Sequence, residues 1–486
     1  MTDVAASVIE RFRPLFEPKT VAVVGASTKG GTLPNVFIRR IREFGYGGAI
    51  YPIHPSAESV DGLKAYRSLG DTPEPVDYAY IAIAAAQVPP LLEEARGRVR
   101  FAQVISSGFG EADEGRDLEN ALAAAARAGG MRLLGPNCLG LHTPRGRVTF
   151  TEDAPKQSGP VGIISQSGGL GTDIIRRGMS RGLEFSGLVT VGNCADITPT
   201  DLVEFYFADP QTRVVGMYLE AAKDGRRLFE ILRDAKARKP VVVLKGGRTR
   251  QGLVAAASHT GALAGDDRVW VALSRQTGCV MVDTLDQFID ALLVFQTLTP
   301  QPQHPTRRVA LFGNGGGTSV LATDCFARLG LDVSPFGRPT LDALAALQLP
   351  PGTSITNPVD CPVGTLRQDE GRVAEKILDI ITGSGKPEAL VIHVNLSAFV
   401  GRTPPEVLDN LVEAALRVQS RYPGRAHFVL VLRSDGDPPL EERKREFRAK
   451  AGALGIPVYD ELANAGHALA ALAFHERFVL SRSGDR

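Results

Sequence analysis

The sequence predicts an α/β protein of three doubly wound domains. Apolar, strand-like runs alternate with amphipathic, helix-like stretches along the whole chain, as in proteins built from βαβ units. Three stretches also resemble one another. Each passes from an apolar strand into a turn of glycine and other small residues that opens a helix: TVAVVGASTKGG (20–31), VGIISQSGGLG (161–171) and VALFGNGGGTS (309–319). We interpret each as the first strand–helix turn of a separate domain.

The segments between these three units mark the expected domain boundaries. TEDAPKQSGP (151–160) is polar, and LTPQPQHPTRR (298–308) contains three prolines. We therefore expect domains at residues 1–150, 155–300 and 306–486. The expected strands are 20–25, 48–53, 78–84, 102–106 and 131–134 in the first domain, 161–165, 186–191, 213–219 and 240–245 in the second, and 308–313, 388–395, 427–433 and 456–459 in the third.

Composition and charge count against several classes of protein. The 486 residues include 55 Lys and Arg against 54 Asp and Glu, so we expect neither a nucleic-acid partner nor a membrane surface. No apolar run reaches the ~18 residues that a membrane helix needs, and the N-terminus has no apolar core of a signal peptide. The five cysteines form no CxxC pair, which argues against disulfides and zinc. We expect a cytoplasmic protein without a metal site of its own.

The three glycine-rich turns are candidate anion sites. A helix N-terminus carries unpaired N–H groups and a partial positive charge, and glycine lets a phosphate approach the backbone. Such turns also occur where nothing binds, but SQSGG and GNGGG lack large side chains at several successive positions. The first turn lacks the second glycine of GxGxxG, and no acid ends the second strand, which counts against NAD and an oxidoreductase. No Walker A motif is present.

A histidine in an unusual setting is the candidate nucleophile. His259 lies in VAAASHTGALAGDD (254–267), a run of small residues that predicts a mobile loop rather than a packed core. Most lone histidines are structural or solvated, whereas an exposed imidazole on such a loop could act as a nucleophile if a carboxylate fixed its second nitrogen. Glu220, at the tip of a strand in the same domain, is the candidate carboxylate, although it could equally be an ordinary surface acid.

Five motifs along nearly the whole chain carry a resemblance to a known family. They are GPNCLGL (135–141), SQSGGLGTD (165–173), VGNCADI (191–197), SHTGALAG (258–265) and NPVDCPVG (357–364). In this order they are similar to motifs of the nucleoside-diphosphate-forming acyl-CoA synthetases, relatives of succinyl-CoA synthetase and of ADP-forming acetate–CoA ligase. The resemblance implies a Rossmann-like CoA-binding domain followed by two flavodoxin-like ligase domains.

The resemblance also implies a chemistry and a role for each candidate residue. In that family, acyl-CoA and phosphate give an acyl phosphate and free CoA, and the acyl phosphate phosphorylates a histidine. The phosphohistidine loop then swings to an ATP-grasp domain, where a nucleoside diphosphate takes the phosphoryl group. His259 is implied as this nucleophile and Glu220 as the carboxylate that orients it. The implied ligand contacts are Ser165, Gln166, Ser167, Gly168, Gly315, Gly316, Gly317 and Thr318 for phosphate, and Gly25, Ala26, Ser27, Pro52, Asn137 and Cys138 for coenzyme A.

The main departure of the sequence from the family is a missing module. The sequence contains no segment with the length or pattern of an ATP-grasp module, so the chain resembles an α-type subunit. We expect a β-type ATP-grasp partner that holds the nucleotide with Mg²⁺, and an oligomeric assembly. The identity of the acyl-CoA and carboxylic acid substrates cannot be read from the sequence.

The sequence also suggests roles for two further residues and one alternative function. Cys138 is interpreted as a small residue lining the CoA site rather than a catalytic thiol, and Asp196 as an acid that could help position the site. The alternative function is a regulatory protein that binds CoA or acyl-CoA without turnover. Such a protein would have no use for His259 and Glu220, which favours the enzyme.

Overall fold

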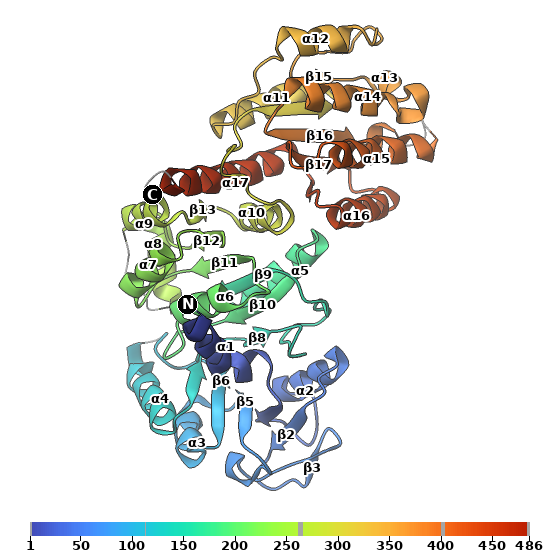
Figure 1. The fold of residues 1–486 in the computed structure, drawn as a ribbon. Coiled ribbons are helices and arrows are strands. Elements are labelled where there is room, and N and C mark those ends of the chain that lie inside the picture. The colour runs from blue at the N-terminus through green and yellow to red at the C-terminus, as the bar shows by residue number, and fades with distance from the viewer. Residues whose placement is uncertain (1, 112, 261–265, 400–403, 484–486) are drawn as a thin grey trace. The chain divides into compact units, whose positions relative to one another are not determined.

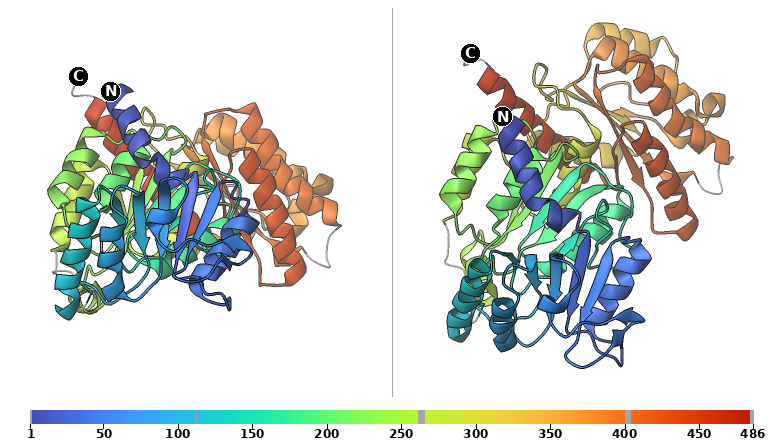
Figure 2. Two further views of the ribbon diagram at one scale, coloured as in Figure 1. Left: turned by 90° about the horizontal axis from the view of Figure 1, so that it is seen from below. Right: turned by 60° about the horizontal axis from the view of Figure 1, so that its bottom comes forward.

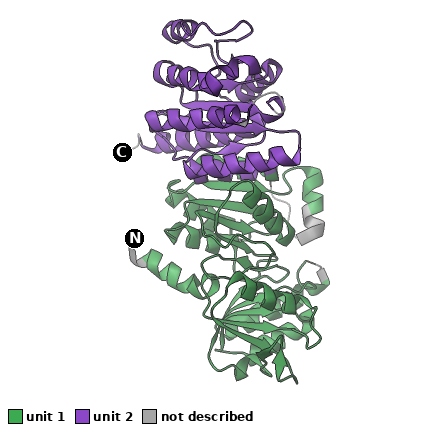
Figure 3. Ribbon diagram, turned by 90° about the vertical axis from the view of Figure 1, so that its right-hand side faces the viewer, with its two compact units in different colours: residues 1–285 green, residues 286–486 purple. Residues whose placement is uncertain are grey.

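The structure, a computed structural model, describes residues 2–111, 113–260, 266–399 and 404–483. The chain divides into two compact units, residues 1–285 (unit 1) and residues 286–486 (unit 2) (Figure 3). Three parallel sheets form their cores, two in unit 1 and one in unit 2, which confirms the α/β fold class (Figure 1). The first two expected domains both lie in unit 1, and their division near residue 155 stays a prediction.

The first sheet of unit 1 contains the five expected strands, all parallel, in the order β2-β1-β5-β6-β7. Helices α1 and α2 pack on one face, and α3 and α4 lie side by side on the other (Figure 2). A small hairpin, β3–β4, was not expected. The elements are α1 (Thr2–Phe16), β1 (Thr20–Val24), α2 (Leu33–Phe44), β2 (Ala49–Ile53), β3 (Ser59–Val60), β4 (Leu63–Lys64), β5 (Val76–Ile81), α3 (Val88–Glu94), β6 (Val99–Val104), α4 (Arg116–Ala128) and β7 (Arg132–Leu134).

The second sheet of unit 1 has the order β13-β12-β11-β9-β10-β8 and contains the four expected strands. The two edge strands were not expected, because strands this short show no alternating pattern. One of them, β8, runs antiparallel to β10. The elements are β8 (Leu141–His142), β9 (Val161–Ser165), α5 (Gly168–Ser180), β10 (Phe185–Thr190), α6 (Pro199–Ala208), β11 (Val214–Leu219), α7 (Gly225–Asp234), β12 (Val241–Lys245), α8 (Arg250–Thr260), α9 (Asp267–Thr277) and β13 (Val280–Val282).

The loop expected around His259 is wrong for residues 254–260, which form the second half of helix α8. Three consecutive alanines at residues 255–257 explain the difference, because alanine has the highest intrinsic helix propensity. Small side chains therefore indicated helix here rather than mobility. Residues 261–265 lie outside the described residues, as do the side chains of residues 256–260.

One hydrophobic cluster joins the two sheets of unit 1. Helix α1 contributes Phe16, whose ring stacks on that of Phe205 in α6 with 4.0 Å between ring centroids. Phe12, one turn earlier, lies 6.0 Å from Phe101 in β6. Aromatic pairs at these distances add to the stabilisation from buried area. The N-terminal helix thus ties both sheets into one body, so residues from either sheet can contribute to one site.

Unit 2 contains a five-stranded parallel sheet in the order β15-β14-β16-β17-β18, which includes the four expected strands. Helices α11 and α17 pack against each other, as do α14 and α15. The elements are α10 (Leu285–Thr297), β14 (Val309–Gly313), α11 (Gly316–Arg328), α12 (Arg338–Ala345), β15 (Val359–Asp360), α13 (Val363–Leu366), α14 (Val373–Ile380), β16 (Ala389–Asn395), α15 (Pro405–Arg421), β17 (His427–Arg433), α16 (Pro438–Ala453), β18 (Val458–Tyr459) and α17 (Leu462–Ser483).

A buried carboxylate holds the proline-rich segment of unit 2. Glu476 of α17 is fully buried and accepts the backbone N–H groups of Gln301 and Thr306, each at 2.7 Å. Its other contact is His427 Nε2 at 3.0 Å. Burial alone would raise the pKa of Glu476, but these hydrogen bonds lower it below the ordinary value. The segment expected as a linker is therefore anchored to the core of unit 2.

The parallel strands of all three sheets share one order. In each, the strand that precedes the glycine-rich turn lies between the second and third parallel strands of its sheet. In open α/β sheets this is the switch point, where helices from neighbouring strands go to opposite faces and a crevice opens at the carboxyl ends. Each predicted anion turn is therefore placed where such folds bind ligands. None of the helices in the described ranges is long and apolar enough to cross a membrane.

Candidate functional site

The turn after β9 presents a helix N-terminus at the switch point of the second sheet. Ser167 is the N-cap residue of α5, and its hydroxyl accepts the N–H of Leu170. The Ser165 hydroxyl fixes the turn by donating to Ser167 O at 2.7 Å. The N–H groups of Gly168 and Gly169 open the helix and have no acceptor within it. A side chain at Gly169 would meet nothing within 4 Å, so this turn fits an approaching anion.

The side chain of Gln166, in the same turn, faces the loop that carries Glu220. Its oxygen accepts the backbone N–H groups of Glu220 and Ala221, the latter at 2.9 Å. Its amide nitrogen lies 3.7 Å from the sulfur of Cys194, and its backbone N–H donates to Tyr218 O at 3.1 Å. Gln166 therefore braces the Glu220 loop against the start of α5.

The carboxylate of Glu220 has one fixed oxygen and one available oxygen. Oε1 accepts the hydroxyl of Tyr218 at 3.0 Å. Burial and the Glu220 carboxylate raise the pKa of Tyr218 above its ordinary value, so the hydroxyl stays protonated and donates. Oε2 is buried and has no hydrogen-bond partner among the described residues. A buried acceptor without a partner is costly, so this oxygen is poised for an N–H donor.

Helix α8, which carries His259, begins a few residues after the strand next to Glu220. That strand, β12, ends in Lys245, which is buried and lies 5.5 Å from the ring of Trp270. Burial lowers the pKa of Lys245, while the charges of Glu220 and Asp267 act in the opposite direction. The side chain of His259 is outside the described residues, so its pairing with Glu220 stays a prediction.

The loop at residues 135–141, from the first sheet, packs against the carboxyl edge of the second. A Cβ on Gly192 would lie 2.2 Å from Pro136 O, so the two backbones can meet only at a glycine. On the other side, a Cβ on Gly168 would lie 2.7 Å from Leu139 Cγ. The structure thus brings together two groups of predicted residues, those for CoA at Asn137 and Cys138 and those for phosphate at Ser165, Ser167 and Gly168.

Cys138 is a packed residue with an unreactive thiol. Its side chain is buried, and burial raises the pKa of the thiol to about 12. The amide of Gln103 donates to Cys138 O at 2.9 Å, and the hydroxyl of Tyr78 donates to Gln103 at 2.9 Å. A thiol that stays protonated at neutral pH is a poor nucleophile. The chemistry of the thiol therefore agrees with a packing role.

The turn after β1 is shaped by Asn35 of α2. This buried amide accepts the N–H of Ser27 at 2.9 Å and donates to Ser27 O at 3.0 Å. Gly25 has φ +98°, and a Cβ there would lie 2.3 Å from Ala82 O, so only glycine fits. Around Gly30 the space is open. The turn is thus braced on its inner side and accessible on its outer side. The predicted CoA residues lie in this turn and near the carboxyl end of the neighbouring strand β2: Gly25, Ala26, Ser27 and Pro52.

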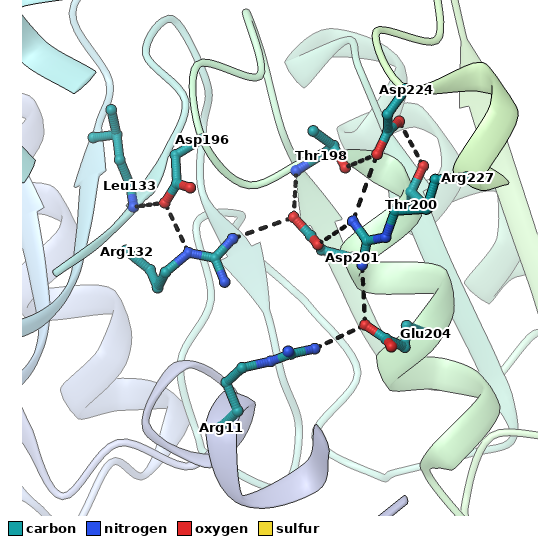
Figure 4. A network of polar contacts seen from close by, with 10 residues as sticks. All are labelled: Arg11, Arg132, Leu133, Asp196, Thr198, Thr200, Asp201, Glu204, Asp224 and Arg227. Carbon is teal, nitrogen blue, oxygen red and sulfur yellow. Dashed lines mark hydrogen bonds and ion pairs between the residues drawn. The ribbon is translucent and has the colours of Figure 1, made fainter. Parts of the chain in front are cut away.

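A network of ion pairs ties the first sheet to the segment after Glu220 (Figure 4). Arg132 of β7 contacts Asp196 at 2.8 Å and Asp201 at 3.2 Å, and Arg227 of α7 contacts Asp201 at 2.7 Å. Burial would raise the pKa of Asp201, but the hydrogen bonds from Arg227 and a backbone N–H lower it. Asp196 thus holds the first sheet through Arg132 and a backbone N–H, and its role in positioning the site stays a prediction.

In unit 2 the turn after β14 opens α11 in the same way. Gly315 is the N-cap residue, with φ +120°, and its N–H donates to Asp360 Oδ1 at 2.8 Å. Arg433, the last residue of β17, donates to Thr318 Oγ1 at 3.1 Å. A cation, Arg433, and a carboxylate, Asp360, therefore both lie beside this helix N-terminus, and Arg433 also contacts Glu461 at 3.0 Å. This is where the structure places the predicted phosphate residues Gly315, Gly316, Gly317 and Thr318.

Sequence reasoning missed several residues that shape these turns. A charged residue at the end of an apolar strand is the signal that pointed to Glu220. Lys245 and Arg433 show the same signal, since they end the strands VVVLK and HFVLVLR. That signal could have found both. Asn35 and Gln103 lie inside a helix and inside a strand, and nothing in the sequence around them distinguishes them from ordinary polar residues.

Comparisons with known proteins agree with this architecture. Residues 19–144 match the CoA binding domain family, and residues 158–295 match the succinyl-CoA ligase like flavodoxin domain. The chain is similar to the alpha subunit of ADP-forming acetate–CoA ligase II of Pyrococcus furiosus, with 32% identity over 93% of this chain and 96% of that protein. The alpha subunit of ligase I of the same organism is 40% identical over 71% of this chain and 75% of that protein.

A solved structure extends the likeness over both units. The dinucleotide forming acetyl-coenzyme A synthetase 1 of Candidatus Korarchaeum cryptofilum, in complex with phosphate and ADP, matches with a TM-score of 0.81 and 30% sequence identity. The match covers 97% of this chain and 98% of that one. The chain therefore belongs to the ADP-forming acyl-CoA synthetases, as an alpha-type chain with a CoA-binding domain, and is an acid–thiol ligase.

Proposed function

We propose that this chain carries out the acyl half of the synthetase reaction through a phosphohistidine at His259. A phosphate oxygen attacks the carbonyl of acyl-CoA, and CoA leaves as the thiol, which gives an acyl phosphate. His259 then takes the phosphoryl group, and the carboxylic acid leaves. A nucleoside diphosphate finally takes the phosphoryl group from the histidine to give the triphosphate. Each step is reversible, so the chain also serves acyl-CoA synthesis.

The observation that carries this proposal is the free oxygen of Glu220. An imidazole that attacks phosphorus through one nitrogen needs its other N–H fixed by an acceptor. Glu220 Oε2 is such an acceptor, since it is buried and has no partner among the described residues while Oε1 is held by Tyr218. His259 lies in helix α8, which follows strand β12 of the same sheet. The family resemblance assigns His259 as the partner of Glu220.

Other turns of the chain would supply the groups that the other reactants need. The N-terminus of α5, with Ser167 and Gly168, would hold phosphate or the phosphoryl group through backbone N–H groups, a form of electrostatic preorganisation. The loop with Asn137 lies against this turn and would bring the thiol end of coenzyme A to it. The turn at Gly25 would hold the nucleotide end of coenzyme A. A second cradle for phosphate is proposed at residues 315–318.

We also propose a partner chain for the nucleotide step. The two Pyrococcus furiosus relatives are named as alpha subunits, which implies a second subunit in those enzymes. For this chain the partner would be a β-type ATP-grasp subunit that holds the nucleoside diphosphate with Mg²⁺. The assembly would be an oligomer of both chains.

Labelled phosphate tests the proposal directly. We expect the purified chain, incubated with labelled phosphate and the matching acyl-CoA, to gain one acid-labile phosphate that maps to His259. His259→Ala should bind CoA normally and gain none. Glu220→Gln should keep CoA binding and gain label slowly, because its amide is a weaker partner for imidazolium. Labelling of His259→Ala at the wild-type rate would refute the assignment.

The same assay, repeated with an ATP-grasp partner and ATP, separates the two half-reactions. If the chain alone gains no label with acyl-CoA, but gains label with the partner and ATP, the acyl site needs the partner for its assembly. No label under either condition would favour a CoA-binding protein without turnover.

A further inference from the structure

The small hairpin β3–β4 of unit 1 has a turn whose backbone geometry is fixed. Val60 pairs with Leu63, so the loop between the two strands contains two residues. Both of them, Asp61 and Gly62, have positive φ, +49° and +77°. A two-residue loop with two positive φ angles is a type I′ turn, for which Asp-Gly is a preferred sequence. Since Val60 is also buried in the core cluster, the backbone of Asp61 is held in place.

The hairpin is tied to both β2 and α2. It lies beside β2 (Figure 1). The N–H of Tyr66 donates to Pro52 O at 2.9 Å, and the N–H of His54 donates to Tyr66 O at 2.8 Å. From α2, Arg42 donates to Asp61 O at 3.3 Å. The side chain of Asp61 is therefore presented to α2 from a fixed support.

The carboxylate of Asp61 accepts a hydrogen bond from Asn35 of α2. Asn35 is fully buried, and its Nδ2 donates to Asp61 Oδ2 at 2.9 Å and to Ser27 O at 3.0 Å. Its Oδ1 accepts the N–H of Ser27 at 2.9 Å and the hydroxyl of Thr32. The amide has two donor and two acceptor positions, and all four are used: two by Ser27, one by Thr32 and one by Asp61.

Asp61 also selects the orientation of the Asn35 amide. An ionised carboxylate only accepts hydrogen bonds, so only the NH₂ group of the amide can face it. In the reverse orientation the amide oxygen would oppose the carboxylate, and the NH₂ group would oppose the N–H of Ser27. Asp61 thus favours the one orientation in which Asn35 holds both backbone groups of Ser27.

We propose that Asp61 is a positioning residue for coenzyme A, which acts through Asn35 on the turn at residues 25–27. The inference rests on the proposed function, because that proposal places the nucleotide end of coenzyme A at this turn. The N–H and C=O of Ser27 are held by Asn35, and its hydroxyl accepts the N–H of Lys29 at 3.1 Å, so the turn keeps one conformation. A turn that is preorganised in this way loses less conformational entropy when the ligand binds.

Asp61→Gly tests the role of the carboxylate, because glycine keeps the type I′ turn while the side chain is lost. One N–H of Asn35 then lacks its acceptor and the amide loses its preferred orientation, so only a fraction of the molecules keeps the braced turn. Because apparent affinity falls with the fraction that is competent to bind, CoA should bind about five- to tenfold more weakly in calorimetry. Asp61→Asn keeps the turn and offers an amide oxygen as acceptor, so its CoA affinity should stay within about twofold of the wild type.

Phosphopantetheine, the part of coenzyme A without the nucleotide, locates the effect. It should bind equally well to Asp61→Gly and to the wild type, because it does not reach the turn. Glu58→Gln is the matched charge control, since it removes an exposed carboxylate next to the same hairpin and should leave CoA binding unchanged. In labelling of His259, Asp61→Gly should need about five- to tenfold more acyl-CoA for half of the maximal rate, while the maximal rate stays at the wild-type value.

The outcomes separate this inference from the proposed function. Wild-type CoA affinity in Asp61→Gly would overturn it, and so would equal weakening of CoA and phosphopantetheine, which would indicate a general loss of structure. If the wild-type chain binds CoA no more tightly than phosphopantetheine, the nucleotide does not contact this turn, and its proposed place fails together with the role of Asp61. Selective weakening of CoA in Asp61→Gly, with no label on His259 from any acyl-CoA, would support the role of Asp61 and refute the phosphohistidine.

Discussion

Removal of the Gln166 side chain should release the loop that carries Glu220. In Gln166→Ala, the backbone N–H groups of Glu220 and Ala221 lose their acceptor. A buried N–H without an acceptor costs ~1–3 kcal/mol. Because these two groups are only partly buried, each costs about the lower value, which gives ~2 kcal/mol for the pair. Because about 1.4 kcal/mol is a factor of ten, the fraction of molecules with Glu220 in position should fall by up to about 30-fold.

Labelling of His259 from acyl-CoA measures this loss. We expect the initial rate in Gln166→Ala to fall by roughly ten- to thirtyfold, while CoA affinity stays near that of the wild type. Gln211→Ala is a matched control, because the Gln211 side chain donates to Ser158 at 2.5 Å and lies before the start of β11, at the opposite end of that strand from Glu220. Wild-type labelling in Gln166→Ala would refute the idea that Gln166 positions Glu220.

Three other predictions concern the first turn, the thiol and the core of unit 2. Gly25→Ala should weaken CoA binding at least tenfold in calorimetry, because its Cβ would meet Ala82 O at 2.3 Å; Gly30→Ala, with open space, should lose only ~1 kcal/mol of stability. Native Cys138 should resist alkylation at about pH 8, since its pKa is raised to about 12, and Cys138→Ala should keep most of the labelling rate; rapid alkylation of the folded chain would contradict this. Glu476→Gln should cost roughly 1–2 kcal/mol near pH 7 in chemical denaturation. The folded pKa of Glu476 is lowered, so its stabilisation is present above the unfolded pKa of ~4.3 and is lost as pH falls through the folded pKa. The gap between Glu476→Gln and the wild type should therefore close at low pH, and a constant gap would contradict the assignment.

Much of the fold could be predicted from local pattern. Every expected strand is present, because runs such as VVGMYL and HFVLVLR are apolar, β-branched and bounded by polar segments. The strands that were missed, such as β8 and β15, have two residues and form only because a neighbouring strand offers hydrogen bonds. The segment before His259 forms a helix instead of the expected loop, because alanine has a high helix propensity as well as a small side chain.

The candidate site was only partly predictable from the sequence. Residues marked by their neighbours in the chain could be predicted, whereas contacts between distant segments could not. Ser167 and Gly315 begin helices, and Glu220 ends a strand region, so each is marked by the residues next to it. The bond from Gln166 to the Glu220 loop spans 54 residues, and the contact between Gly192 and Pro136 spans slightly more. No local pattern records such pairs.

By itself the sequence determined the α/β class and the three glycine-rich turns, and it marked the candidate reactive residues. These depend on side-chain periodicity and on the backbone freedom of glycine, which act within a few residues. Only the tertiary structure decided that all three turns lie at switch points, that Glu220 keeps one oxygen free, and that Lys245 lines a cavity beside it. Strand order and burial arise from packing between distant segments, and it is this packing that sets the surroundings of an ordinary acid or lysine.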